Sequence, residues 1–451
     1  MADVIVIGAG LSGLAAAHRL MTLGLDVRLL ERASYAGGHV RTVQRDGWRH
    51  EAGPNSFLGS ATALHALASE VGLTPLAARP AANKRYLFID GRLQSLPSGP
   101  LDAITTPLLP FAAKLRLLTE PLRRGRARED ESVREFFDRR LGPEVTSRFV
   151  DAFVAGIYAG DVTQMGIAAS FPKLYAMAKE HGSLTRGAFA AMRTKRAAAH
   201  PERSRGVRGT FSFANGLREL PDALAKKLGD RLELGAEVTV ARDGDEWIAG
   251  SHRAPELVLA TPAGAAASLL ESIAPELSRE LTRLDYAPIA GVHLLHRTDS
   301  LRQPLDGFGF LVPRREGVRT LGCIWSSALF DVAPAGHAAL TCFIGGARDR
   351  EALALSDAEL IETVERELAR MMGLSGAPVD AAVVRHARAI PQYGTGHVAW
   401  RSQIDSLLRA TPGLSLAGNF LDGISMGDTI ARGERVAGEV AARRVAKAKA
   451  A

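Results

Sequence analysis

The chain has 451 residues, 46% of them hydrophobic, which is enough to bury the cores of two or three globular domains and excludes a disordered polypeptide. Its formal net charge is +7, but no aromatic-interleaved basic platform accompanies the charge, so no nucleic-acid partner is expected. The two cysteines, Cys323 and Cys342, offer neither a metal-ligand cluster nor a disulfide framework, so we expect no metal site and a reducing compartment.

The first predicted element is a strand that leads through a Gly-rich turn into a helix. Residues 4–7 are apolar, an Ala-rich helical pattern follows the turn, and a second strand ends at Glu31. A pyrophosphate on a helix N-terminus needs this order: Gly8 permits the tight turn, Gly10 the approach of the phosphates and Gly13 the packing of helix on strand. Glu31 can accept ribose hydroxyls. The predicted dinucleotide contacts are Gly8, Ala9, Gly10, Leu11, Ser12, Gly13 and Glu31.

The segment after Glu31 favours FAD over NAD. Residues 32–42 read Arg-Ala-Ser-Tyr-Ala-Gly-Gly-His-Val-Arg-Thr, which resembles the second phosphate-side segment of glutathione-reductase-type flavoproteins. Two adjacent glycines give a bare loop beside ribose and diphosphate, and Arg41 adds positive charge. His39 stands where relatives often carry Arg or Lys, although a plain loop histidine is equally compatible. The predicted contacts are Arg32, Gly38 and His39.

Residues 84–97 predict a β-hairpin that turns at Asp90-Gly91. From about residue 98 to 192 the pattern is helical and interrupted by prolines, which indicates an insertion. Residues 193–208 are basic and poor in apolar residues, which predicts a mobile loop.

Residues 111–128 combine leucines with an excess of cations. An amphipathic basic surface of this kind can bind anionic lipid, with each cation contributing on the order of 1 kcal/mol. A solvated helix face is the equally weighted alternative. Because no run of about 20 apolar residues exists, we expect a cytoplasmic protein, peripheral on the inner face of the cell membrane. The cations are Lys114, Arg116, Arg123, Arg124, Arg126 and Arg128, against Glu120.

The second half of the chain returns to the nucleotide domain. A helix from Gly216, strands at 231–234 and 237–240, and a buried strand at 256–262 are predicted, and the backbone of Val238 is the predicted adenine contact. Several strand-like runs in residues 285–345 indicate a separate sheet that forms a pocket wall. A last strand, a Gly-bordered turn and a helix follow from residue 413. The dipole of that helix suits the isoalloxazine end of FAD, with predicted backbone contacts from Ile424, Ser425 and Met426.

Together these elements predict an α/β fold with α+β parts. It comprises a Rossmann-type FAD-binding domain built from discontinuous segments, a mixed-sheet substrate domain and a helical, membrane-binding insertion. The predicted bounds are 1–80, 209–265 and 386–451 for the FAD-binding domain, 81–97 and 266–385 for the substrate domain, and 98–208 for the insertion.

Six dispersed segments point to one family, and over nearly its whole length the chain resembles the oxygen-dependent protoporphyrinogen oxidases. The segments are Glu51-Ala-Gly-Pro-Asn-Ser-Phe-Leu, Asn83-Lys-Arg-Tyr, Gly156-Ile-Tyr-Ala-Gly-Asp, Ser170-Phe-Pro-Lys-Leu, Gly307-Phe-Gly-Phe-Leu-Val-Pro and Ile390-Pro-Gln-Tyr.

The resemblance implies an FAD-dependent, O2-using, six-electron oxidation of protoporphyrinogen IX to protoporphyrin IX in haem biosynthesis, with release of H2O2. Hydride leaves a meso carbon for the flavin N5, so no catalytic side chain is demanded, and the sequence offers no triad. The resemblance also implies a homodimer and hand-over of the product to a ferrochelatase.

The resemblance assigns the substrate contacts by position. Arg85 matches a propionate-binding arginine, Leu311 and Ile324 match residues that sandwich one pyrrole ring, and Phe343 matches one that stacks on another. Taken singly, each apolar residue is equally compatible with plain core. Asn55 lies where the family's loop passes near the flavin and the active centre. The flavin contacts assigned to this loop are Gly53, Pro54, Asn55 and Ser56.

Three other functions stay open. A coproporphyrinogen III oxidase would share the fold but bind four propionates. A flavin amine oxidase usually has an aromatic cage or a cysteine for covalent attachment near the flavin, and residues 401–451 contain no Cys, Tyr or Trp, which favours non-covalent FAD. A non-catalytic protein that carries flavin or porphyrin is the third alternative function.

Overall fold

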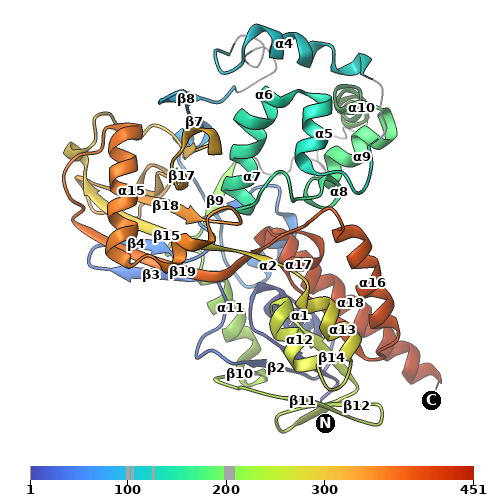
Figure 1. The fold of residues 1–451 in the computed structure, drawn as a ribbon. Coiled ribbons are helices and arrows are strands. Elements are labelled where there is room, and N and C mark those ends of the chain that lie inside the picture. The colour runs from blue at the N-terminus through green and yellow to red at the C-terminus, as the bar shows by residue number, and fades with distance from the viewer. Residues whose placement is uncertain (1, 98–101, 103–105, 124–126, 198–208, 451) are drawn as a thin grey trace.

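The computed structural model describes residues 2–97, 102, 106–123, 127–197 and 209–450. Two sheets, each flanked by helices, lie side by side, and a cluster of helices sits against their junction (Figure 1).

A five-stranded parallel sheet forms because its central strands β1 and β14 are apolar except at Glu256 and are buried at every position. Its order is β10-β2-β1-β14-β20, and every neighbouring pair is parallel. The strands come from three distant parts of the chain, which confirms the predicted Rossmann-type fold of discontinuous segments. They are β1 (Val4–Ile7), β2 (Val27–Glu31), β10 (Leu232–Leu234), β14 (Glu256–Leu259) and β20 (Leu414–Leu416).

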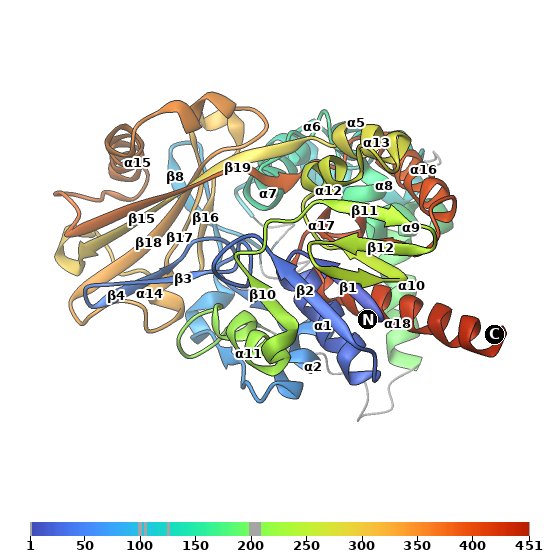
Figure 2. The same ribbon diagram turned by 90° about the horizontal axis from the view of Figure 1, so that it is seen from below.

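Alternate residues of β1 pack into different cores, as the two-residue period of a strand requires. Val4 and Val6 contact the helices of one face, whereas Ile5 and Ile7 contact those of the other (Figure 2). The first face carries α1 (Leu11–Thr22), α2 (Thr62–Glu70), α11 (Glu219–Leu228) and α18 (Met426–Ala450). The second carries α12 (Ala263–Leu270), α13 (Pro275–Thr282), α16 (His397–Arg409) and the small sheet of β11 (Val240–Asp243), β12 (Glu246–Ala249) and β13 (His252–Ala254).

The second large sheet has seven strands in the order β19-β15-β18-β17-β16-β7-β8, and α15 (Asp357–Met372) packs on it (Figure 1). Asp90 and Gly91 both have positive φ, the backbone that a two-residue hairpin between β7 and β8 needs. The strands are β7 (Tyr86–Ile89), β8 (Arg92–Ser95), β15 (Tyr286–Arg297), β16 (Gly309–Leu311), β17 (Thr320–Ile324), β18 (His337–Gly345) and β19 (Asp380–Pro391).

Short strands and helices connect the two large sheets and their flanking helices. Two small sheets pair β3 (Thr42–Arg45) with β4 (Trp48–Glu51), and β9 (Thr210–Ser212) with β5 (Phe57–Leu58) and β6 (Leu76–Ala77). The short helices are η1 (Pro80–Asn83), η4 (Gly229–Arg231), η5 (Thr298–Ser300), η6 (Arg314–Glu316), α14 (Ser326–Leu329), η7 (Arg350–Ala354) and α17 (Asn419–Asp422).

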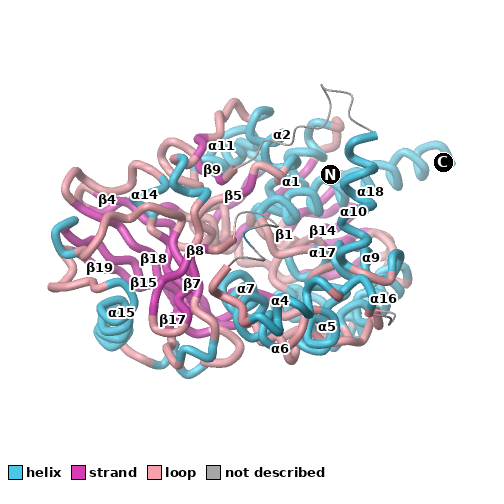
Figure 3. The backbone as a smooth tube through the Cα atoms, turned by 90° about the horizontal axis from the view of Figure 1, so that it is seen from above, coloured by secondary structure: helices cyan, strands magenta, loops and turns pink. Residues whose placement is uncertain are grey.

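The helical insertion has its own core and lies beside β7 and β17, as Figure 3 shows from above. Its helices are α4 (Phe111–Leu118), η2 (Glu120–Leu122), α5 (Val133–Arg140), α6 (Pro143–Val145), η3 (Thr146–Val150), α7 (Asp151–Tyr158), α8 (Ile167–Ser170), α9 (Pro172–His181) and α10 (Leu184–Ala197).

Glu120 joins two parts of this insertion. Its buried carboxylate accepts hydrogen bonds from the Ser183 hydroxyl at 2.6 Å and from the Leu184 and Thr185 backbone N–H groups at the start of α10. The buried Arg140 guanidinium lies 3.5 Å from the same carboxylate. Glu120 is therefore a structural residue, although the sequence placed it on the basic surface segment.

We expect Glu120→Ala to lower the free energy of unfolding by about 3–5 kcal/mol, because it removes the buried carboxylate that pairs with Arg140 and accepts hydrogen bonds from the start of α10. Urea unfolding of purified protein measures the change. Glu144→Ala, on an exposed residue of the same insertion, is the control, and an equally small effect in both variants would contradict the assignment.

The structure differs from the sequence prediction at three places. The strand predicted at residues 237–240 is absent from residues 237–239, which are irregular, and β11 begins at Val240. Helices α12 and α13 pack against the parallel sheet, although the predicted bounds placed the chain from residue 266 in the substrate domain; the strands predicted from residue 285 begin at Tyr286. Residues 193–197 end helix α10, and the rest of the predicted loop, 198–208, lies outside the described residues.

Candidate functional site

The Gly-rich turn takes the geometry that a dinucleotide pyrophosphate requires. Gly8 has φ +101°, and a side chain on Gly13 would overlap the Gly8 carbonyl oxygen, so α1 lies directly against the strand–turn junction. The N-cap of α1 is Gly10, with no side-chain cap and no acidic residue in the first turn. The helix N-terminus therefore presents unshielded N–H groups to an anion.

Glu31 lies at the end of β2, directly beside this turn. Its carboxylate accepts the Ala9 N–H at 2.7 Å and the Ala33 N–H at 2.8 Å. The side chain is thereby fixed at the carboxyl edge of the parallel sheet, where ligands of open α/β sheets bind.

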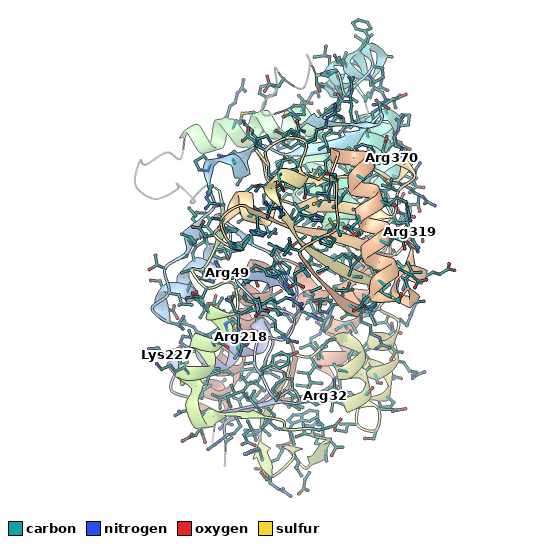
Figure 4. All side chains as sticks on the ribbon, turned by 90° about the vertical axis from the view of Figure 1, so that its left-hand side faces the viewer. Arg32, Arg49, Arg218, Lys227, Arg319 and Arg370 are labelled. Atoms are coloured by element: carbon teal, nitrogen blue, oxygen red, sulfur yellow. The ribbon has the colours of Figure 1, made fainter. Side chains whose placement is uncertain are left out.

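The second predicted segment runs alongside the first. Gly37 donates its N–H to the Ala9 carbonyl at 2.7 Å, and Gly38 lies against Gly10. Leu11, Ser12 and Ala9 are buried in the turn, whereas Arg32 is exposed and is labelled in Figure 4 on the same side of the molecule as Arg49 and Arg218.

Two observations test whether this turn fits FAD. A Cβ built on Gly10 meets nothing within 4 Å, so the backbone faces open space of the kind a phosphate would fill. The Ser12 hydroxyl is buried and has no partner within the described part of the chain. Because buried polar atoms are normally paired, both features fit a bound dinucleotide.

The predicted flavin end of the site forms at the start of α18. Tyr393 donates its hydroxyl to the Asn419 carbonyl and accepts the Gly423 N–H at 3.0 Å, which fixes the turn before the helix. Ser425 caps the helix by accepting the Asp428 N–H at 3.1 Å. Ile424 is half-buried and Met426 is buried against α1 and α2. The two helix N-termini thus belong to helices that pack on each other.

The remaining predicted flavin contacts border the same region. Asn55 donates its side-chain N–H to the Gly53 carbonyl at 3.1 Å, and a Cβ on Gly53 would overlap the His39 carbonyl, so the two loops touch. Pro54 and Ser56 are half-buried in the same loop as Asn55. Val238 is half-buried in the irregular segment before β11, on the far side of Glu31.

The structure brings three of the predicted substrate residues onto one face of the seven-stranded sheet. Across the strands, Phe343 is the register partner of Gly322, which in turn is the partner of Leu311. On its other side Phe343 pairs with Gly291. Ile324 is two residues from Gly322 and therefore shares its face. The three apolar side chains are half-buried, and the glycines between them, which sequence reasoning did not identify, allow close packing: a Cβ on Gly322 would meet the Leu311 side chain at 3.0 Å.

Arg85 joins this face from β7. Leu87 is the register partner of Leu311, so Arg85, two residues earlier, points to the same side of the sheet. Its guanidinium lies 5.0 Å from the Phe308 ring, which packs with Ile324. Partial burial lowers the pKa of Arg85, although the residue stays exposed to solvent.

Asn55 and Ile324 line a common small cavity of about 30 Å³, together with Arg49 and Ser326. Arg49 was not predicted as a site residue. The alternation of residues 48–51 on β4 could have indicated it, because Trp48 and His50 are buried and Arg49 faces the other way.

Four imidazoles lie between the flavin loop and the second sheet. The His50 and His293 rings stack at 4.2 Å, and His39 meets His386 edge to face at 4.6 Å. Desolvation lowers the pKa of both His39 and His50 to about 4. These rings are therefore neutral at physiological pH, and His39 supplies no charge to a diphosphate.

Glu51 is the one carboxyl beside this site with a strongly raised pKa, which desolvation brings to about 7. It accepts the Leu217 N–H at 2.9 Å and the Thr42 hydroxyl at 2.8 Å. Its role is to tie the β3–β4 hairpin to the segment before α11.

We expect the stability of the protein to fall between pH 4.5 and 7 because of Glu51. In this window the unfolded chain releases the Glu51 proton and the folded chain keeps it, so the free energy of unfolding decreases as pH rises. Glu51→Gln should remove about 1–3 kcal/mol of this dependence, measured by urea unfolding from pH 4.5 to 8. Parallel curves for the two proteins would refute it.

Within the described ranges no group of His, Cys, Asp and Glu could hold a metal ion. No helix there combines the length and apolarity needed to cross a membrane.

Comparison with known proteins gives one family and a consistent set of relatives. The model for flavin containing amine oxidoreductases matches residues 11–441. The mitochondrial protoporphyrinogen oxidase of Nicotiana tabacum is 33% identical, over 95% of this chain and 93% of its own. The coproporphyrinogen III oxidase of Bacillus subtilis is 28% identical, over 96% of both chains.

Solved structures share the fold. A protein from Exiguobacterium sp. 255-15 superposes with a TM-score of 0.81 at 24% identity, covering 98% of this chain and 99% of its own. Cyclohexylamine oxidase from Brevibacterium oxydans IH-35A superposes with a TM-score of 0.72 at 18% identity, covering 98% and 99%.

Proposed function

This chain belongs to the family of flavin containing amine oxidoreductases, and from that membership we propose that it oxidises protoporphyrinogen IX to protoporphyrin IX with FAD and O2. The observation that carries the proposal is the apolar face formed by Leu311, Ile324 and Phe343, with Arg85 on the same side of the sheet. A large apolar macrocycle that bears propionates needs this combination.

FAD is proposed to lie along the two loops that touch at Gly10 and Gly38, with its pyrophosphate at the N-terminus of α1 and its flavin at the start of α18. When bound, the flavin takes two electrons at a time from the substrate and returns them to O2. Attachment is proposed to be non-covalent, since residues 401–451 contain no Cys.

The side chains are proposed to bind and orient the substrate. Leu311, Ile324 and Phe343 replace water on the macrocycle faces, and Arg85 binds a propionate through a charge-assisted hydrogen bond. Burial lowers the pKa of His39, His50 and His293, so these rings are neutral, and no side chain of the apolar face is assigned as a base. Three two-electron cycles remove six electrons and yield three H2O2.

A coproporphyrinogen III oxidase is the second candidate. The name of the Bacillus subtilis relative supports it, and so does Arg49, a second cation beside Asn55 and Ile324. The test compares protoporphyrinogen IX and coproporphyrinogen III as substrates in air by porphyrin fluorescence. We expect kcat/KM to be at least about 10-fold higher for the first, and the reverse order would transfer the proposal to the second.

Membrane association is proposed for the insertion. Phe111, Leu115, Leu118 and Leu122 repeat at helical spacing on α4 and η2, and their side chains are 52–81% exposed. Phe189 and Met192 of the adjoining helix α10 are exposed as well. Arg123 lies beside this apolar face, and the predicted cations Arg124 and Arg126 lie outside the described residues.

Replacing Phe111, Leu118 and Leu122 together by serine is expected to reduce co-sedimentation with anionic liposomes by about 10-fold or more. Leu58→Ser with Val379→Ser, on exposed apolar residues elsewhere, is the control. Unchanged sedimentation of the triple variant would favour the solvated-face alternative. The cytoplasmic location stays a prediction from the sequence, and the homodimer and the ferrochelatase hand-over stay predictions of the resemblance.

A further inference from the structure

Arg49 is a cation of the β3–β4 hairpin that lacks a partner among the described residues. Its side chain is half-buried, and no hydrogen bond or ion pair from the described part of the chain reaches its guanidinium. Arg45, on the same hairpin, instead donates two hydrogen bonds to Asp380, at 2.7 and 2.8 Å. Because an arginine that loses part of its hydration normally gains an acid or another acceptor, the donors of Arg49 are left for a ligand.

The Arg49 side chain lines the small cavity that Asn55 and Ile324 also line. Its volume of about 30 Å³ is room for about two water-sized atoms. The two oxygens of a carboxylate would fill this space, whereas the four oxygens of a phosphate would not fit. The size of the cavity therefore favours a carboxylate as the anion that Arg49 binds.

Polar and apolar groups share the wall of this cavity. Asn55 uses one amide N–H for the Gly53 carbonyl, so its second N–H stays available as a donor. The apolar part of the wall is formed by Ile324, Leu329 and Phe330. A carboxylate on a short methylene chain matches this wall, because the donors bind the oxygens and the apolar side chains contact the methylene groups.

Glu51 is the one acid among the described residues that line the cavity. Its carboxylate accepts the Leu217 N–H and the Thr42 hydroxyl, and it forms no ion pair with Arg49. Desolvation raises the pKa of Glu51 to about 7, so about half of the Glu51 carboxyls are neutral at that pH. Glu51 thus offsets only part of the Arg49 charge, and a ligand carboxylate can supply the rest.

Arg49 and Arg85 border one apolar cluster. The Arg85 guanidinium lies 5.0 Å from the Phe308 ring, and both Phe308 and Ile324 pack against the cluster that contains Leu329. Ile324 and Leu329 also line the Arg49 cavity. Protoporphyrinogen IX carries two propionates on neighbouring pyrrole rings, so two cations that border one apolar cluster suit it.

We propose that Arg49 binds the second propionate of the porphyrinogen, with its carboxylate in the cavity beside Asn55. This inference rests on the proposed function and restricts the substrate class to macrocycles with at least two carboxylates. Arg85 holds one propionate and Arg49 the other, so the two arginines together fix the orientation of the macrocycle on the apolar face.

Binding of protoporphyrin IX and of its dimethyl ester to the flavin-loaded protein tests this assignment without catalysis. The ester keeps the macrocycle and removes both negative charges. In titrations that follow porphyrin fluorescence, we expect Arg49→Met to raise the Kd of the diacid by about 10-fold and to leave the Kd of the ester unchanged. Arg49→Lys should lose less, because it keeps the charge. Arg218→Met, on an exposed arginine on the same side of the molecule (Figure 4), is the control and should bind the diacid as the wild type does.

Equal Kd values of the wild type and Arg49→Met for the diacid, or an equal loss for the diacid and the ester, would overturn the assignment of Arg49. Turnover of protoporphyrinogen IX tests the proposed oxidase separately. Turnover by both proteins with the same KM would overturn the role of Arg49 and leave the oxidase standing. Binding of the diacid that depends on Arg49, without turnover, would overturn the oxidase and leave the carboxylate assignment standing.

Discussion

Gly10→Val is expected to yield a folded protein that no longer retains flavin. The φ of −69° at Gly10 is allowed for valine, and a Cβ there meets no atom within 4 Å, so the protein itself tolerates the side chain. The valine would instead occupy the space proposed for the pyrophosphate. We expect FAD affinity to fall by at least about 100-fold, corresponding to roughly 2.7 kcal/mol, with an unchanged circular dichroism spectrum.

Gly438→Val is the matched control, because a Cβ on this exposed residue of α18 also meets nothing. It should cost no helix stability, because valine has a better helix propensity than glycine, and it should keep the flavin. Flavin fluorescence during equilibrium dialysis gives both affinities. Equal flavin content in the two variants would remove the N-terminus of α1 from the cofactor site.

Arg85→Ala is expected to raise KM for protoporphyrinogen IX by about 10- to 100-fold with a smaller change in kcat. The arginine is proposed to bind a propionate that is not altered by the reaction, so it contributes uniform binding of about 1.5–3 kcal/mol. Partial desolvation beside Phe308 strengthens that contribution.

Arg85→Lys should recover part of the loss, since the charge stays while the two-pronged donor is lost. Arg92→Ala, on the exposed strand of the same hairpin, removes an equal charge and should leave KM unchanged. If Arg85→Ala and Arg92→Ala had the same KM, Arg85 would not contact the substrate.

The parts of the fold that could be predicted are those encoded by short-range patterns. The run Val4–Ile7 followed by three glycines predicts strand, turn and helix, because burial on both faces and a close helix–strand approach leave few alternatives. The hairpin at Asp90-Gly91 is encoded in the same local way.

Features that depend on which strands become neighbours could not be predicted. The apolar face forms because Gly322 and Gly291 flank Phe343, and these three residues lie on different strands. In the same way, Cys323 and Cys342 look isolated in sequence but are register partners on β17 and β18. Both are buried and free, and burial raises the pKa of the Cys323 thiol, so they behave as core residues.

Residue-level errors have similarly physical causes. Residues 237–239 alternate like a strand, but the segment runs irregularly from Glu31 to the small sheet and has no pairing partner before Val240. In the sequence, Glu120 looks like a single acid among surface cations. It is buried only because α10 packs against it in the folded chain. Nothing in the sequences of helices α12 and α13 indicates which of the two large sheets they cover.

The most direct test of the account mixes flavin-loaded protein with protoporphyrinogen IX without oxygen and then admits air. We predict that the visible flavin absorption bleaches before air is admitted and returns afterwards, with three H2O2 released for each protoporphyrin IX formed. A flavin that stays oxidised with protoporphyrinogen IX, or porphyrin formed no faster than in the protein-free blank, would contradict the proposed oxidase and favour a carrier.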